Sequence, residues 1–250
     1  MKTPYLATTL IKGLEVLEAL SELEETGLTE LAQRLELPSP TLFRLLATLV
    51  EQGYVRKTPA SRYRLTLKSW EIGARVAGRM PLRTVARPFL EQLAARTAET
   101  VHLSVREGDG IVIVDKVDSP HPVRVDTYIG LRTPLHCSAT GKAFLAFQPE
   151  PLTGLKLARY TEATVTDRAT LERELAEIRR TGWARNREEW RAGVCAAAVP
   201  IRDRREGVVA VLSITVPTSR FTATALRQRL VPALQSTGKA LSQEAARLPS

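Results

Sequence analysis

Cysteine is nearly absent from this sequence. The 250 residues include two cysteines, Cys137 and Cys195, which are too few for a disulfide framework. So low a count suits a protein that stays in a reducing cytosol, and a cytoplasmic location is therefore expected. Neither cysteine belongs to a Cys-x-x-Cys pair, and the three histidines, His102, His121 and His136, show no zinc-ligand spacing. We expect no structural metal and no cofactor.

Long apolar runs are also missing. No stretch approaches the roughly 20 apolar residues that a membrane-spanning helix needs, so no membrane partner is expected. The N-terminus lacks the hydrophobic segment of a signal peptide, because residues 6–20 carry charges at helical spacing and are typical of an amphipathic helix. A G-x-S-x-G nucleophile elbow is absent as well, which argues against a common class of hydrolase.

Positive charge, by contrast, is abundant and unevenly distributed. The chain has a formal net charge of +9 and a pI near 9.9. Residues 1–25 contain Lys2 and Lys12 against five glutamates, whereas residues 26–68 contain seven basic residues against three glutamates. Charge concentrated in one region favours a polyanionic partner that binds there.

The basic region has the pattern of a winged helix-turn-helix. Thr29 is placed to cap a first short helix, which Pro38 would end because proline disfavours helical geometry in the residue before it. Ser39 is placed to cap a second helix, with Pro40 at its first position, and Gly53 is placed to stop it. Four leucines in this second helix recur at the spacing of a buried face: Leu42, Leu45, Leu46 and Leu49.

The outer face of the second helix and the hairpin after it predict contacts with double-stranded DNA. Short polar residues and an arginine near the start of a recognition helix can reach base edges in the major groove, and we expect this of Ser39, Thr41, Phe43 and Arg44. Residues 54–57 and 62–65 alternate like two strands of a basic wing. We expect phosphates to be held by Arg34, Lys57, Arg62 and Arg64, with Arg56 adding charge nearby.

The remaining sequence predicts an α+β domain with one antiparallel sheet. We expect helices over residues 6–23, 67–79, 84–97, 138–147, 170–181 and 222–248, and strands over residues 101–105, 111–117, 123–128, 194–201 and 208–216. The predicted domains are a DNA-binding domain over residues 1–66, a linker helix over residues 67–81, and an α+β domain over residues 82–250, to which the family resemblance described next assigns effector binding and oligomerisation. The linker helix is also a candidate contact with a partner subunit.

The chain resembles the IclR family of bacterial transcriptional regulators over nearly its whole length. The resemblance rests on segments in a fixed order, among them LTELAQRLELPSPTLFRLLATLVEQGYV, VARPFLEQLAARTAETVHLSV, LRTPLHCSATGKAFLA and AAVPIRDRREGVVAVLSITVP. It implies a winged-helix domain, a linker helix and a GAF-like effector-binding domain. It also implies a homodimer or a dimer of dimers, a palindromic or near-palindromic operator, and control by a small organic molecule.

The same resemblance implies an effector pocket lined by Ala139, Thr140, Gly141, Asn186, Cys195 or Ala196, Ser213 and Thr215. The chemistry is consistent, since a helix that begins after Ser138 offers free N–H groups to a carboxylate, and two hydroxyls two residues apart on a strand share one face. The family often has Asp where this chain has Asn186, and the loss of an anion there favours an anionic ligand. We therefore expect a small organic acid as effector. The family's usual turn glycine before the VHLSV strand is Ala98 here.

Two alternatives to a ligand-controlled regulator stay open. In the first, the protein binds DNA without an effector and its second domain only dimerises. In the second, which is less favoured, the second domain is a small-molecule hydrolase, although the three histidines lie outside the proposed pocket segments. Some of these residues also have a purely structural interpretation. Ser213 and Thr215 are then hydroxyls that hydrogen-bond within a sheet, and Cys137 is a small buried apolar residue.

Overall fold

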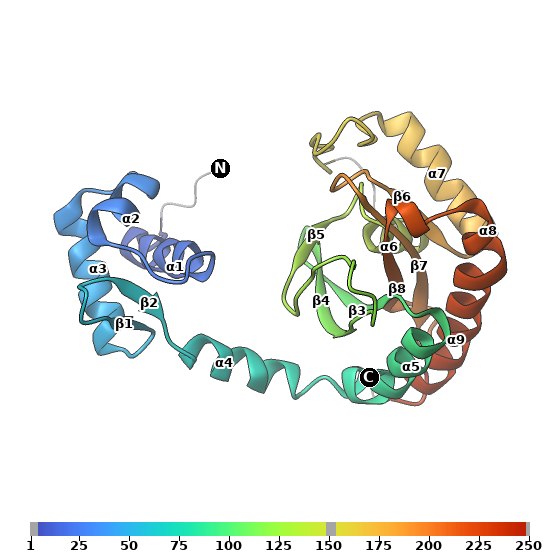
Figure 1. Cartoon of the computed structure of the whole chain (residues 1–250), viewed down its shortest axis with the longest axis horizontal. Coiled ribbons are helices and arrows are strands. Elements are labelled where there is room, and N and C mark those ends of the chain that lie inside the picture. Colours follow the sequence, from blue (N-terminus) through green and yellow to red (C-terminus); the bar gives the residue numbers. More distant parts are fainter. Residues whose placement is uncertain (1–4, 149–153, 249–250) are drawn as a thin grey trace. The chain divides into compact units, whose positions relative to one another are not determined.

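The computed structural model describes residues 5–148 and 154–248 (Figure 1). The chain divides into two compact units, Met1–Arg79 and Met80–Ser250. No helix of the described residues is long and apolar enough to cross a membrane. The same part of the chain contains no cluster of three or more His, Cys, Asp or Glu residues that could hold a metal ion.

The first unit packs three helices against a short hairpin. Its elements are α1 (Thr8–Ser21), α2 (Leu28–Arg34), α3 (Ser39–Glu51), β1 (Val55–Lys57), β2 (Tyr63–Leu65) and α4 (Lys68–Ala77). The core contains the inward leucines predicted for α3, with Leu42, Leu45 and Leu46 buried and Leu49 packed against them at its edge. Tyr63 of the hairpin is buried in the same core, which fixes the wing to the helices.

Two helix starts differ from the prediction. Helix α2 begins at Leu28, so Thr29 is inside the helix, and the carboxylate of Glu30 accepts a hydrogen bond from the N–H of Gly27 at 3.5 Å. Helix α3 begins at Ser39 and not after it, because the carbonyl of Pro38 already accepts from the N–H of Leu42. The predicted stop is confirmed, since Gly53 has a φ of +75°, a conformation that glycine adopts at little cost.

The second unit is built on a six-stranded antiparallel sheet with the order β5-β4-β3-β8-β7-β6. Its strands are β3 (Thr100–Glu107), β4 (Gly110–Val117), β5 (Arg132–Pro134), β6 (Ala184–Arg187), β7 (Val194–Arg202) and β8 (Val208–Pro217). Its main helices are α5 (Pro81–Thr97), α6 (Ala139–Phe147), α7 (Arg168–Thr181) and α9 (Val231–Ala245). A short helix α8 (Ala223–Ala225) and a π-helical turn (Leu226–Leu230) lead into α9.

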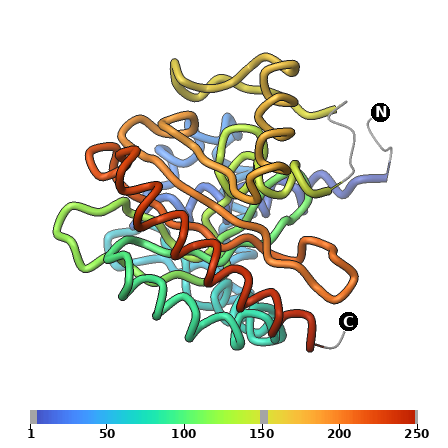
Figure 2. Tube along the Cα trace, turned by 90° about the vertical axis from the view of Figure 1, so that its right-hand side faces the viewer, coloured from blue at the N-terminus to red at the C-terminus, as the bar shows by residue number. Residues whose placement is uncertain are grey.

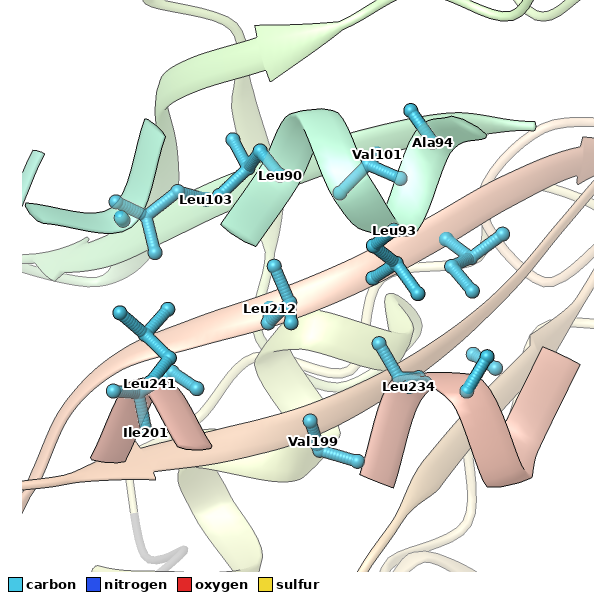
Figure 3. Close-up of a cluster of buried hydrophobic side chains, with 14 of the residues drawn as sticks. Leu90, Leu93, Ala94, Val101, Leu103, Val199, Ile201, Leu212, Leu234 and Leu241 are labelled. Carbon is cyan, nitrogen blue, oxygen red and sulfur yellow. The ribbon is translucent and has the colours of Figure 1, made fainter. Parts of the chain in front are cut away.

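Helices cover both faces of this sheet. Helices α5 and α9 run side by side across one face, as Figure 2 shows, and α6 packs on the other face with α7 behind it. The first face holds the larger core, in which side chains of α5 and α9 meet every second residue of β3, β7 and β8 (Figure 3). Because side chains alternate along a strand, the residues between them point towards α6.

Two segments of the sheet domain differ from the prediction. Residues 123–128 form no strand, and β5 pairs with β4 in their place. The side chain of Thr127 bonds to His102, and its carbonyl accepts from Lys116, so this segment is held by side chains and not by a ladder. Strand β6 was not predicted, although Ala184–Arg187 alternates between buried and exposed residues.

A candidate DNA-binding surface and a candidate effector cavity

The outer face of α3 presents the residues proposed to reach DNA bases. Ser39, Phe43 and Arg44 are exposed and Thr41 is half-buried. Phe43 is notable because 52% of its surface is exposed, although the helix has a well-formed apolar face on its other side. A phenyl ring on the polar face of a helix next to an arginine is suited to an apolar contact such as a thymine methyl group.

The wing places two arginines directly opposite each other. Arg56 pairs with Arg64 in the antiparallel register of β1 and β2, and both side chains are exposed. Residues paired in this way share one face, with Cα atoms roughly 5 Å apart, so the two guanidinium groups repel each other. A phosphate group between or beside them would relieve that repulsion.

The other basic residues proposed to contact phosphates have partners within the domain. Arg62 contacts the carboxylates of Glu25 and Glu30, at 3.1 and 3.2 Å, and donates to the carbonyl of Glu25. Arg34 pairs with Glu22. The ammonium of Lys57 lies 5.8 Å from the centre of the Tyr63 ring. Arg62 therefore ties the wing to the segment before α2.

Glu30 of α2 is the second carboxylate that pairs with Arg62 of the hairpin. The hydroxyl of Thr26 and the N–H of Gly27 bond to its carboxylate and, together with Arg62, hold the pKa of Glu30 below its usual value. The carboxylate is charged at neutral pH, so it can pair with Arg62 and hold the hairpin against α2.

The second unit contains a cavity on the α6 side of the sheet. Its floor is made of neighbouring residues on four strands. The register aligns Asn186, Ala196 and Thr215 in one row, and Ser213 and His102 in the next. The small side chain of Ala196 on β7 leaves room that a larger one would fill, and the hydroxyls of Ser213 and Thr215 on β8 face that room.

The N-terminus of α6 forms one wall. Ser138 caps the helix by accepting from the N–H of Gly141 at 3.0 Å, and it donates to the carbonyl of Pro134 at 2.6 Å. The hydroxyls of Thr133 and Thr140 lie 3.3–3.4 Å from that of Ser138 and from each other. The first N–H groups of a helix have no partner within it, so this end of α6 offers donors to an anion.

Most residues predicted for the pocket line this cavity, and two do not. Ala139, Thr140, Asn186, Ala196, Ser213 and Thr215 line it. Gly141 packs instead against the backbone of Leu135, where a Cβ would lie 2.3 Å from the carbonyl oxygen. Cys195 is in the core on the opposite face of the sheet, because it alternates with Ala196 along β7.

Several lining residues were missed by the sequence reasoning. His102 and Ser104 from β3, Thr127 from the segment that crosses the cavity, and Trp190 and Arg191 from the turn after β6 all line it. The expectation that all three histidines lie outside the pocket was therefore wrong for His102. The signal was present, since the alternation of VHLSV puts His102 and Ser104 on the face opposite the apolar residues.

A buried ion pair fixes the turn that carries Trp190 and Arg191. The ammonium of Lys142 donates to both carboxylate oxygens of Glu189, at 2.7 and 2.8 Å, and to Glu174 at 2.9 Å. Burial raises the pKa of Glu189, and Lys142 opposes that rise. The N–H of Glu189 donates to the side-chain oxygen of Asn186 at 2.9 Å, so the pair also sets how Asn186 faces the cavity.

The cavity is small and largely apolar between its polar groups. It contains about 520 Å³ free of protein atoms, part of it open to solvent. This volume is within the roughly 300–1,000 Å³ of small-molecule pockets, so the cavity has room for one compact ligand. No described lining residue is acidic, and Arg191 is the only basic one apart from the neutral His102.

Known protein families match both units. The model of the IclR helix-turn-helix domain matches residues 9–59, and the model of the bacterial transcriptional regulator IclR C-terminal domain matches residues 74–243. The chain belongs to the IclR family of transcriptional regulators.

Relatives in this family align over nearly the entire chain. The HTH-type transcriptional regulator KdgR of Escherichia coli is 36% identical over 97% of this chain and 94% of its own length. The crystal structure of the Thermotoga maritima IclR protein superposes with a TM-score of 0.78 at 29% identity, covering 96% of this chain and all of that one. An IclR homolog from Microbacterium hydrocarbonoxydans, crystallised with 4-hydroxybenzoate, gives a TM-score of 0.79 at 27% identity over 95% and 98% of the two chains.

The family assignment confirms the resemblance seen in the sequence and the class of fold, a helix-turn-helix domain followed by an IclR effector domain. The IclR C-terminal match spans α5 to α9, so it includes every strand and helix that forms the cavity. The helix-turn-helix match includes α2, α3 and β1. KdgR of Escherichia coli is named as an HTH-type transcriptional regulator.

Proposed function

We propose that this protein is a transcriptional regulator whose DNA binding is controlled by a small organic acid bound in the cavity of the second unit. The observation that supports this best is the chemistry of the cavity. The free N–H groups of α6, a guanidinium at Arg191 and the hydroxyls of Ser213 and Thr215 line it, and no described carboxylate does. Such a site favours an anion over a neutral or cationic ligand.

For the DNA, we propose that bases are contacted by Ser39, Thr41, Phe43 and Arg44, and that phosphates are contacted by Arg56, Lys57 and Arg64. Arg62 and Arg34 would support the wing and α2 from within, because each pairs with a glutamate of its own domain. Phosphate contacts position a protein on DNA, whereas base contacts select the sequence.

We also propose that the protein acts as a homodimer or a dimer of dimers. Apolar side chains are exposed along two helices of the first unit: Leu10 and Leu14 of α1, at 63% and 51%, and Trp70 and Val76 of α4, at 60% and 64%. Large exposed apolar residues spaced along a helix are unfavourable in water and are typical of a surface that a second copy covers. A symmetric dimer would present two reading heads to a palindromic operator.

A thermal-shift screen of small acids combined with DNA binding tests this proposal. A ligand at about 100 times its Kd stabilises the folded state by about 2.7 kcal/mol, which a melting curve detects easily. We expect at least one acid to raise the Tm and to change the affinity for operator DNA. Failure of every acid to do either would favour the alternative in which the second domain only dimerises.

The hydrolase alternative receives little support from the geometry. Burial raises the pKa of Cys137 to about 12 and raises that of Cys195, so neither thiol ionises readily. The hydroxyl of Thr215 lies 3.2 Å from Nδ1 of His102, but burial lowers the pKa of His102 to about 4, which makes it a poor general base at neutral pH. Turnover of an acid by the purified protein would revive this alternative.

A further inference from the structure

Ser104 has a buried hydroxyl whose partner is missing from the protein. The residue is 1% exposed, it lines the cavity, and its Oγ makes no hydrogen bond to any residue that the structure describes. A β-bulge interrupts the pairing of β3 and β4 between Leu103 and Ser104, with Val114 of β4 as the extra residue, and bulges are common beside functional sites. Buried hydroxyls in proteins are nearly always paired, so the structure indicates a partner that enters the cavity.

The neighbouring His102 belongs to a chain of three polar groups. Its Nε2 lies 2.8 Å from the hydroxyl of Thr127, and its Nδ1 lies 3.2 Å from the hydroxyl of Thr215. A neutral imidazole has one N–H donor and one acceptor nitrogen. The imidazole and the two threonine hydroxyls each carry one proton that can be donated. Two of these protons form the hydrogen bonds within the chain, so one threonine hydroxyl is left to donate into the cavity. Which threonine it is depends on the tautomer of His102.

We propose that Ser104 and Thr127 form a second hydrogen-bonding subsite in the cavity, which binds a neutral hydroxyl or carbonyl group of the effector, and that His102 orients Thr127 by donating to it from Nε2. This inference rests on the proposed function, in which the carboxylate of the effector lies at the N-terminus of α6. Neither hydroxyl carries a charge, and burial keeps His102 neutral as well. The subsite would therefore make the protein select acids that carry a second polar group over unsubstituted acids of the same size.

Matched pairs of acids test this selectivity. The probes are glycolate and acetate, lactate and propionate, 3-hydroxybutyrate and butyrate, and 4-hydroxybenzoate and benzoate, each titrated into the full-length protein and followed by thermal shift and calorimetry. One net hydrogen bond corresponds to about a threefold to tenfold difference in affinity, so the hydroxylated member of a binding pair should bind tighter by that factor. Ser104→Ala should abolish the preference and leave the affinity for the unsubstituted member unchanged.

A matched serine separates a ligand-binding hydroxyl from a structural one. Ser119 is also buried, but its Oγ donates to the carbonyl of Ala98 at 2.7 Å. Without ligand, Ser119→Ala should lower the Tm, whereas Ser104→Ala should leave it unchanged or raise it, since it removes an unpaired buried hydroxyl. An equal loss of Tm in both variants would overturn the subsite, because Ser104 would then have a partner inside the protein.

The remaining outcomes are equally decisive. The subsite is overturned if no member of the four pairs binds, or if a pair binds without preference, or if the preference persists in Ser104→Ala and in Thr127→Val. Binding to operator DNA is measured in parallel on the same samples. Selectivity for hydroxylated acids without DNA binding would refute the proposed function and leave the subsite intact. DNA binding without selectivity between the paired acids would refute the subsite and leave the proposed function intact.

Discussion

The two opposed arginines of the wing allow a quantitative test of the DNA surface. Each cationic side chain that neutralises a phosphate releases counterions, and log Kd then rises with log salt with a slope of about 0.9 per contact. We predict that Arg64→Ala lowers the salt slope of DNA binding by about 0.9, and that Arg56→Ala/Arg64→Ala lowers it by about 1.8. Removal of one arginine also removes the repulsion between them, so the variants should remain folded.

The same relation gives the loss of affinity. Counterion release from one contact is worth about fourfold in Kd at about 0.2 M monovalent salt and about fifteenfold at about 0.05 M. The assay is fluorescence anisotropy with a labelled duplex of about 30 base pairs, titrated at several salt concentrations. Non-specific duplex suffices, because phosphate contacts are independent of sequence.

Arg62 provides the matched control within the same hairpin. Its guanidinium is bonded to Glu25 and Glu30, so Arg62→Gln should weaken the attachment of the wing without changing the number of phosphates contacted. Its salt slope should equal that of the unaltered protein, while its Tm should fall. An unchanged slope in Arg64→Ala, or equal slope losses in Arg64→Ala and Arg62→Gln, would refute the assignment of phosphate contacts.

Three further predictions concern the second unit. The pKa of His102 is about 4 in the folded protein against 6.5 in the unfolded chain. Protonation of the unfolded chain therefore lowers the free energy of unfolding by about 3 kcal/mol as the pH falls from 6.5 to 4, and urea unfolding of His102→Gln should lack that loss. Ala98 has a φ of +53°, so Ala98→Gly should raise stability by about 0.5–1 kcal/mol, and a lower Tm would contradict this. Lys142→Met leaves the carboxylate of Glu189 buried and unpaired and should cost about 3–5 kcal/mol, most of which Lys142→Met/Glu189→Leu should restore in chemical denaturation.

Local periodicity was enough to predict the elements with a strong pattern of their own. The leucines of α3 predicted its buried face, and the alternating hairpin of β7 and β8 was expected within one or two residues of its observed bounds. The cap at Ser138 was also predicted correctly, because a capping serine acts on its own helix. Such features depend on neighbours within a few residues, which the sequence shows directly.

Features that depend on pairing between distant residues were harder to predict. Residues 123–128 alternate like a strand, yet Thr127 bonds to a histidine on β3 and the edge of the sheet is occupied by β5. Alternation along β7 separates Cys195 from Ala196, but which of the two faces the cavity depends on the side of the sheet that α6 covers. The alternation of VHLSV indicates the face on which His102 lies, but its contact with Thr215 and its place beside Ser213 depend on the pairing of β3 with β8.

The most direct test of the regulator is selection of genomic DNA fragments by the purified full-length protein, at physiological salt and with excess competitor DNA. The proposed function predicts enrichment of one palindromic or near-palindromic motif, and it predicts that an acid that raises the Tm of the protein changes the affinity for that motif. Recovery of fragments with no shared motif, or a motif whose affinity is indifferent to every acid that binds the protein, would contradict ligand-controlled recognition of an operator.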